Sequence, residues 1–120
     1  MNLPDLDFIP GAAVMTRVIS HPAKGVFTTD LGYKAIASDP AGQRGYIVGL
    51  EDAVPIIHSE EHWAFRLEDE SRIPAIGTCL YVIPTHICPT TALYPEILVA
   101  KDGQVADRWQ VTARNRRITY

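Results

Sequence analysis

The stretch GTCLYVIP, residues 77–84, is the strongest strand signal in the chain. It is short, bounded by Gly and Pro, and rich in β-branched and aromatic residues, which fit a pleated and buried surface. Similar runs recur on both sides of it, because nine Pro and eight Gly interrupt the sequence at intervals of about ten residues. This punctuation favours short strands over long helices.

Strands are also predicted at residues 12–20, 25–30 and 45–50. The runs AVPIIHS and HWAFRL predict a hairpin around Ser59-Glu60-Glu61, and residues 96–111 predict a second one, because Asp102-Gly103 separates two alternating runs. Helical periodicity is absent apart from one turn near residues 88–95. We therefore predict an all-β fold of seven or so strands, mostly antiparallel, in a small barrel or sandwich.

Length and composition indicate one domain, residues 1–120, which can bury a core without disulfides. A net charge of −3 argues against nucleic acid or a membrane surface as partner, and no apolar run could span a bilayer. The N-terminus lacks the basic region of a signal peptide, so we expect a cytoplasmic protein with reduced Cys79 and Cys88. Cys79 is expected to pack within its apolar run, and the arginines near the C-terminus are interpreted as a solvated tail: Arg114, Arg116 and Arg117.

The segment PTHICPT, residues 84–90, carries the clearest candidate for chemistry. His86 and Cys88 are two positions apart and would point to the same face of an extended backbone. Imidazole and thiolate are both zinc ligands, and the flanking prolines would stiffen the loop. The alternative is a chance His and Cys in a loop, because two donors do not complete a structural zinc site. Two protein ligands with open positions would suit a catalytic metal.

A second candidate is Ser59-Glu60-Glu61-His62. Glu beside His could orient the imidazole ring or take part in acid–base chemistry. The simpler interpretation is that the two glutamates are solvated at a hairpin tip and that His62 packs at the start of a strand. His21 and His58 are interpreted as surface or loop histidines without a role.

The third candidate is the segment DLGYKAIASDPAG, residues 30–42. Its Asp30, Lys34 and Asp39 could line a pocket or pair among themselves. The sequence itself favours a turn stabilised by Asp30 and Gly32. Lys34 is not predicted to bind a cofactor as a Schiff base, because no glycine-rich phosphate-binding loop opens a helix nearby.

Taken in order, five blocks resemble the C-terminal domain of the D-serine dehydratase and D-threonine aldolase family. The resemblance covers essentially the full length. The blocks are a first strand with Val18, Ile19, Ser20 and Pro22, the pattern D-x-G-x-K-A-x-x-S-D at 30–39, SEEH at 59–62, P-x-H-x-C-P-T at 84–90, and the hairpin from Val99 to Trp109.

The resemblance implies an alanine-racemase-like architecture, in which a (β/α)₈ barrel holds pyridoxal phosphate on a lysine and precedes this β-domain. The barrel is absent from these 120 residues. The metal-binding pair of the family falls on His86 and Cys88, with His62 as a neighbour that supports the metal or the substrate. The dehydratase branch has His and Cys with zinc, and the aldolase branch has His and Asp with a harder ion such as manganese. Cys88 therefore favours dehydratase-like chemistry, D-serine to pyruvate and ammonia, over aldolase-like chemistry.

The implied function is the metal-binding part of a pyridoxal-phosphate- and zinc-dependent D-amino acid lyase. Its expected partners are a barrel domain of the same or another chain, a small D-amino acid, and a second subunit in a homodimer. The 120 residues alone are expected to be inactive, and whether they are cut from a longer protein stays open. The alternatives are a non-catalytic β-module for interaction or assembly and, disfavoured by the acidic charge, a nucleic-acid-binding small barrel.

Overall fold

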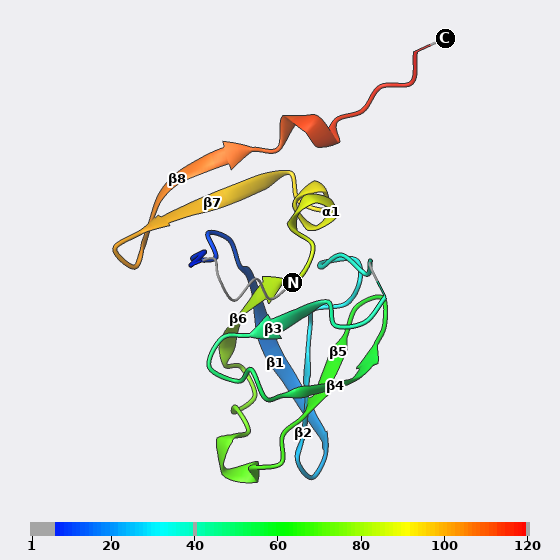
Figure 1. Ribbon diagram of the computed structural model, residues 1–120, viewed down its shortest axis with the longest axis vertical. Coiled ribbons are helices and arrows are strands. Elements are labelled where there is room, and N and C mark those ends of the chain that lie inside the picture. Colours follow the sequence, from blue (N-terminus) through cyan, green and yellow to red (C-terminus); the bar gives the residue numbers. More distant parts are fainter. Residues whose placement is uncertain (1–6, 40, 120) are drawn as a thin grey trace.

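The computed structural model describes residues 7–39 and 41–119, which form eight β-strands and one short α-helix (Figure 1). Two 3₁₀ turns, η1 (Glu70–Arg72) and η2 (Thr112–Arg114), complete this part of the chain. The main elements are β1 (Val14–Ala23), β2 (Val26–Thr29), β3 (Gly45–Ile47), β4 (Val54–His58), β5 (Trp63–Arg66), β6 (Cys79–Pro84), α1 (Ile87–Ala92), β7 (Glu96–Lys101) and β8 (Gln104–Gln110). The predicted all-β fold is confirmed.

Six strands form one antiparallel sheet in the order β3-β6-β1-β2-β5-β4. The long strand β1 joins its two halves. The first part of β1 pairs with β6, from Val14 opposite Val82 to Arg17 opposite Cys79, and the second part pairs with β2. Irregularities in the β1–β2 register between Val18 and Ala23 allow the sheet to bend. The result is a partly open barrel curled around one core.

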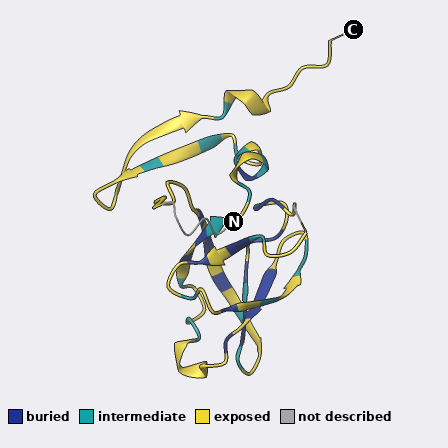
Figure 2. Ribbon diagram, viewed as in Figure 1, coloured by how far each residue is buried: buried dark blue, intermediate teal, exposed yellow. Residues whose placement is uncertain are grey.

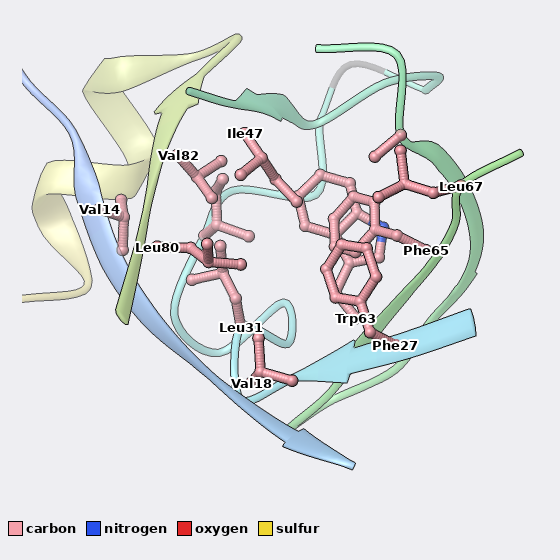
Figure 3. Close-up of a cluster of buried hydrophobic side chains, with 12 residues drawn as sticks. Val14, Val18, Phe27, Leu31, Ile47, Trp63, Phe65, Leu67, Leu80 and Val82 are labelled. Carbon is pink, nitrogen blue, oxygen red and sulfur yellow. The ribbon is translucent and has the colours of Figure 1, made fainter. Parts of the chain in front are cut away.

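Most of the core comes from inward-facing residues of these strands, and residues outside them, among them Leu31 and Leu67, complete it (Figure 3). In β1 the side chains of Val14, Thr16 and Val18 are buried while those between them are exposed, as expected for a strand with one face on a core. Strand β5 contributes two aromatic side chains to the core, Trp63 and Phe65, whose ring centroids lie 4.6 Å apart. Each fully buried large apolar side chain stabilises the fold by about 1.5–3 kcal/mol.

Cys79 does not pack in the core, so that prediction is wrong. The alternation along β6 turns Leu80 and Val82 inward and therefore turns Cys79 outward, where its thiol is exposed. Cys88 is also exposed, and both cysteines are free thiols.

The helix α1 is the helical turn predicted near residues 88–95. No helix within residues 7–39 and 41–119 is long and apolar enough to cross a membrane.

The strands β7 and β8 form a separate two-stranded sheet beyond α1 (Figure 1). Its turn has positive φ at both Asp102 (51°) and Gly103 (75°), which is the two-residue hairpin geometry predicted from the Asp-Gly pair. Most of its side chains are exposed (Figure 2). The Cα radius of gyration, 15.7 Å, exceeds the roughly 13–14 Å expected for a compact chain of this length. The hairpin therefore projects from the barrel.

Candidate metal centre

His86 and Cys88 lie where β6 leads into α1. Thr85, between Pro84 and His86, is fixed to the segment before β3: its backbone N–H donates to the carbonyl of Arg44 at 2.8 Å, and its hydroxyl donates to the carbonyl of Gln43 at 2.8 Å. These two bonds fix the position of the backbone directly before His86, at the start of α1.

The extended backbone predicted for this pair ends at His86. This residue is the N-cap of α1 and has extended dihedral angles, φ −127° and ψ 97°, whereas Cys88 already lies in the first helical turn. The two-residue periodicity of a strand therefore does not describe their relative direction. The Cys88 side chain is exposed, and the His86 side chain is 43% exposed.

The two nitrogens of the His86 ring have different surroundings. Nδ1 is buried and lies 3.3 Å from Oδ2 of Asp39, close enough for an ion pair but without hydrogen-bond geometry, and it has no other hydrogen-bond partner. Nε2 forms no hydrogen bond within the described part of the chain, and unlike Nδ1 it is not buried. Nε2 is therefore the nitrogen that is accessible to a ligand.

Asp39, at the end of the D-x-G-x-K-A-x-x-S-D pattern, is close to His86 and does not pair with Asp30 or Lys34 as the sequence allowed. Hydrogen bonds from the preceding residues hold it beside α1. The backbone N–H of Ala37 donates to Oγ1 of Thr90 at 3.1 Å, and that hydroxyl donates to the carbonyl of His86 at 2.8 Å. The hydroxyl of Tyr94 donates to the carbonyl of Ala35 at 2.7 Å. Segment 35–39 is thereby attached to the helix that carries Cys88.

The other end of the pattern is structural. A turn follows Gly32, whose carbonyl accepts from the backbone N–H of Ala35 at 2.9 Å, but Asp30 does not stabilise that turn as predicted and is bonded to β1 instead. Oδ1 of Asp30 accepts hydrogen bonds from the Thr16 hydroxyl at 2.6 Å and the Arg17 backbone N–H at 2.8 Å. Gly32 lies so close to the backbone of Glu60 that a Cβ would overlap it. Only glycine fits at this approach.

Lys34 does not pair with Asp30 or Asp39. Its ammonium lies 2.5 Å from Glu61 and 3.0 Å from Glu60, and these carboxylates raise the pKa of Lys34. The two glutamates at the hairpin tip are thus engaged in exposed ion pairs. Lys34 therefore belongs to a solvent-exposed ion cluster on the surface of the domain.

His62 lines a groove of about 340 Å³ on the outer surface of the sheet, and the lining includes no residue of α1. The groove is largely apolar, and its lining includes Ile19, Pro22 and Ile57. Among residues 7–39 and 41–119, no three His, Cys, Asp or Glu side chains are grouped so that they could hold one metal ion. A role for His62 at the metal centre stays a prediction.

His58 is half-buried at the end of β4, so its interpretation as a surface or loop histidine holds only in part. Its ring packs against the buried Trp63, with centroids 4.7 Å apart, and its Nε2 lies 3.2 Å from the carbonyl of Leu31. Burial lowers the pKa of His58 below its usual range.

The family model described as "Putative serine dehydratase domain" matches residues 11–100. The chain belongs to this family. An uncharacterised protein of Mycobacterium tuberculosis, a relative of the domain, is 33% identical over 115 residues, which cover 93% of this chain and 86% of that protein. A D-threonine aldolase of Arthrobacter sp is 31% identical over 104 residues, which cover 84% of this chain but 26% of the aldolase.

Solved structures agree with this assignment. A D-threonine aldolase from Filomicrobium marinum superposes with a TM-score of 0.77 and 25% identity, over 85% of this chain and 28% of the aldolase. A D-threo-3-hydroxyaspartate dehydratase from Delftia sp. HT23 gives a TM-score of 0.64 and 28% identity, over 82% of this chain and 31% of the dehydratase. The serine dehydratase domain thus spans less than a third of these solved enzymes.

Mutants of D-threo-3-hydroxyaspartate dehydratase have also been solved. One has a His replaced by Ala, and another has the Cys two positions further along replaced by Ala and is described as the metal-free form.

Proposed function

We propose that this chain is the metal-binding domain of a pyridoxal-phosphate- and zinc-dependent D-amino acid lyase of the dehydratase type, with His86 and Cys88 as its two protein ligands. One observation carries the proposal. A His and a Cys two positions apart stand at the start of α1 in a serine dehydratase domain. The substituted His and Cys of the solved dehydratase mutants have the same spacing.

The residues present fit an open zinc site. Nδ1 of His86 is buried against Asp39, which leaves Nε2 as the donor atom, and the thiol of Cys88 is exposed. No third protein ligand stands with them in the described part of the chain, so the remaining positions would go to water and substrate. Zinc bound there would supply a Lewis acid and a template for a substrate oxygen. The soft thiolate favours zinc over manganese.

Pyridoxal phosphate does not fit the described residues. Lys34 is exposed on the surface beside two carboxylates, and no glycine-rich loop opens a helix near it to hold a phosphate. We therefore place the cofactor, as part of this proposal, on a barrel domain of the same or a partner chain. Together they would act on a small D-amino acid with a β-hydroxyl group, as a homodimer. An aldolase-like reaction is the nearest alternative chemistry, since two of the named relatives above are D-threonine aldolases.

Zinc titration calorimetry on the 120-residue chain tests the ligand pair, and the chain offers a matched control. Replacing Cys88 by Ser should abolish zinc binding, whereas replacing Cys79, which is also exposed, by Ser should leave it unchanged. Wild type should bind zinc more tightly than manganese. Equal zinc affinities of wild type and C88S would remove the metal centre from this proposal.

The groove beside His62 favours a second candidate, a non-catalytic module that docks on another domain. Its lining of Ile19, Ile56 and Ile57 is an apolar surface of the kind that other proteins cover. A wild-type chain that binds no zinc at all would favour this candidate over the first.

A further inference from the structure

We propose that Asp39 positions His86: its carboxylate accepts the Nδ1 hydrogen of the imidazole and thereby leaves Nε2 as the nitrogen that faces a metal. The tautomer depends only on the contact between Asp39 and His86 and not on a metal. The consequence for metal binding rests on the proposed function.

Nδ1 of His86 needs a hydrogen-bond partner. This atom is buried, has no hydrogen-bond partner, and lies 3.3 Å from Oδ2 of Asp39. A buried polar atom without a partner is destabilising, so the nearby carboxylate is favoured as its hydrogen-bond acceptor. The Asp39 side chain is 65% exposed and is free to turn its oxygen into line with the ring.

The two residues are also brought together by fixed backbone. Ala37, two residues before Asp39, is hydrogen bonded to Oγ1 of Thr90, and the same hydroxyl is hydrogen bonded to the carbonyl of His86. Thr90 is almost fully buried, with 2% of its surface exposed. The backbone on both sides of the contact is therefore anchored by one side chain.

The chemistry of metal-binding histidines explains what this contact would do. Such a histidine commonly donates its other N–H to a carboxylate, which fixes the tautomer and the ring orientation and makes the ligating nitrogen more basic. Asp39 would act through His86, because within the described residues it forms no three-donor group with His86 and Cys88. The alternative is that Asp39 and His86 form an ordinary exposed ion pair, which would affect neither the tautomer of His86 nor its affinity for zinc and would add little stability.

Two measurements on the same variants separate these alternatives. The first is the tautomer of His86 in the metal-free chain, read from its imidazole ¹⁵N shifts with the ring neutral and assigned by comparison with H86Q. The second is zinc affinity by calorimetry. The variants are D39A, D39N, whose amide oxygen still accepts a hydrogen bond, and E68A as a control that removes another exposed carboxylate.

We expect the Nδ1–H tautomer in wild type, D39N and E68A, and a shift to Nε2–H in D39A. Zinc affinity should fall about 10–100-fold in D39A, fall less in D39N, and stay unchanged in E68A. The same tautomer and the same zinc affinity in wild type and D39A would overturn the inference. A wild type that binds no zinc, but whose tautomer changes in D39A, would sustain the positioning role and overturn the proposed function instead.

Discussion

The backbone N–H of Ala37 and the hydroxyl oxygen of Thr90 are joined by a 3.1 Å hydrogen bond across 53 positions of the sequence. Thr90 is buried, and its hydroxyl also donates to the carbonyl of His86 at the start of the same helix. One side chain therefore satisfies two backbone groups from segments that are distant in the sequence. Together with the bond from the Tyr94 hydroxyl to the carbonyl of Ala35, it holds segment 35–39 beside α1.

Replacing Thr90 by Val should lower the free energy of unfolding by about 1–3 kcal/mol, because the isosteric side chain leaves the buried N–H of Ala37 without a partner. Urea denaturation followed by the fluorescence of the buried Trp63 measures this. Thr91 provides the control, since its hydroxyl makes the same kind of bond to the carbonyl of Ile87 but holds no other segment. T91V should change stability by less than about 0.5 kcal/mol. Equal losses in both variants would contradict the bridging role.

Replacing Tyr94 by Phe should cost about 1 kcal/mol through the lost bond to Ala35. Burial, and next the charge of Asp30, raises the pKa of Tyr94. The folded chain then holds the phenol proton more tightly than the unfolded chain, so this stability is present below about pH 10 and is lost as the pH rises through the folded pKa. Unfolding measured from pH 8 to 11 should show a fall that Y94F reduces. The exposed Tyr81, replaced by Phe, should leave the fall unchanged.

Replacing Gly32 by Ala should destabilise the chain by about 1–3 kcal/mol or more, because the new Cβ would overlap the backbone of Glu60 and force two packed segments apart. Thermal unfolding checks this. The matched control is G11A, since a Cβ at Gly11 meets no atom within 4 Å. A melting temperature of G32A as high as that of G11A would show that the loop and the hairpin are not packed as described.

His58 should make the fold sensitive to mild acid. Because burial lowers its pKa, the folded chain binds the imidazole proton less readily than the unfolded chain. The corresponding stability is present above about pH 6.5 and is lost as the pH falls toward the folded pKa. Unfolding free energies at pH 8 and pH 5.5 should differ less in H58Q than in wild type. H62Q, at an exposed position, should keep the wild-type difference; a matching reduction there would refute this assignment.

The strands could be predicted from sequence because β-branched runs between Gly and Pro act locally, and so does the Asp102-Gly103 turn. The direction of Cys79 could not, because a continuous apolar run does not reveal which alternate residues face inward. The start of α1 at Ile87 could not be predicted either, because prolines next to His86 and Cys88 are compatible both with a stiff loop and with the first turn of a helix. The approach of Asp39 to His86 depends on bonds between distant segments, and no local pattern contains it.

The projecting hairpin is expected to unfold locally while the barrel stays folded. None of the residues in the buried cluster comes from β7 or β8, and the base of the hairpin is closed by a bond from the N–H of Val111 to the carbonyl of Pro95. Two strands without a covered apolar face are only marginally stable in water. We therefore expect their amides to exchange with solvent by local opening, well before those of β1 and β6, as hydrogen exchange would measure. Tyr94, bonded to Ala35, lies just ahead of this unit. The hairpin can thus open and close while His86, Cys88 and Asp39 keep their places.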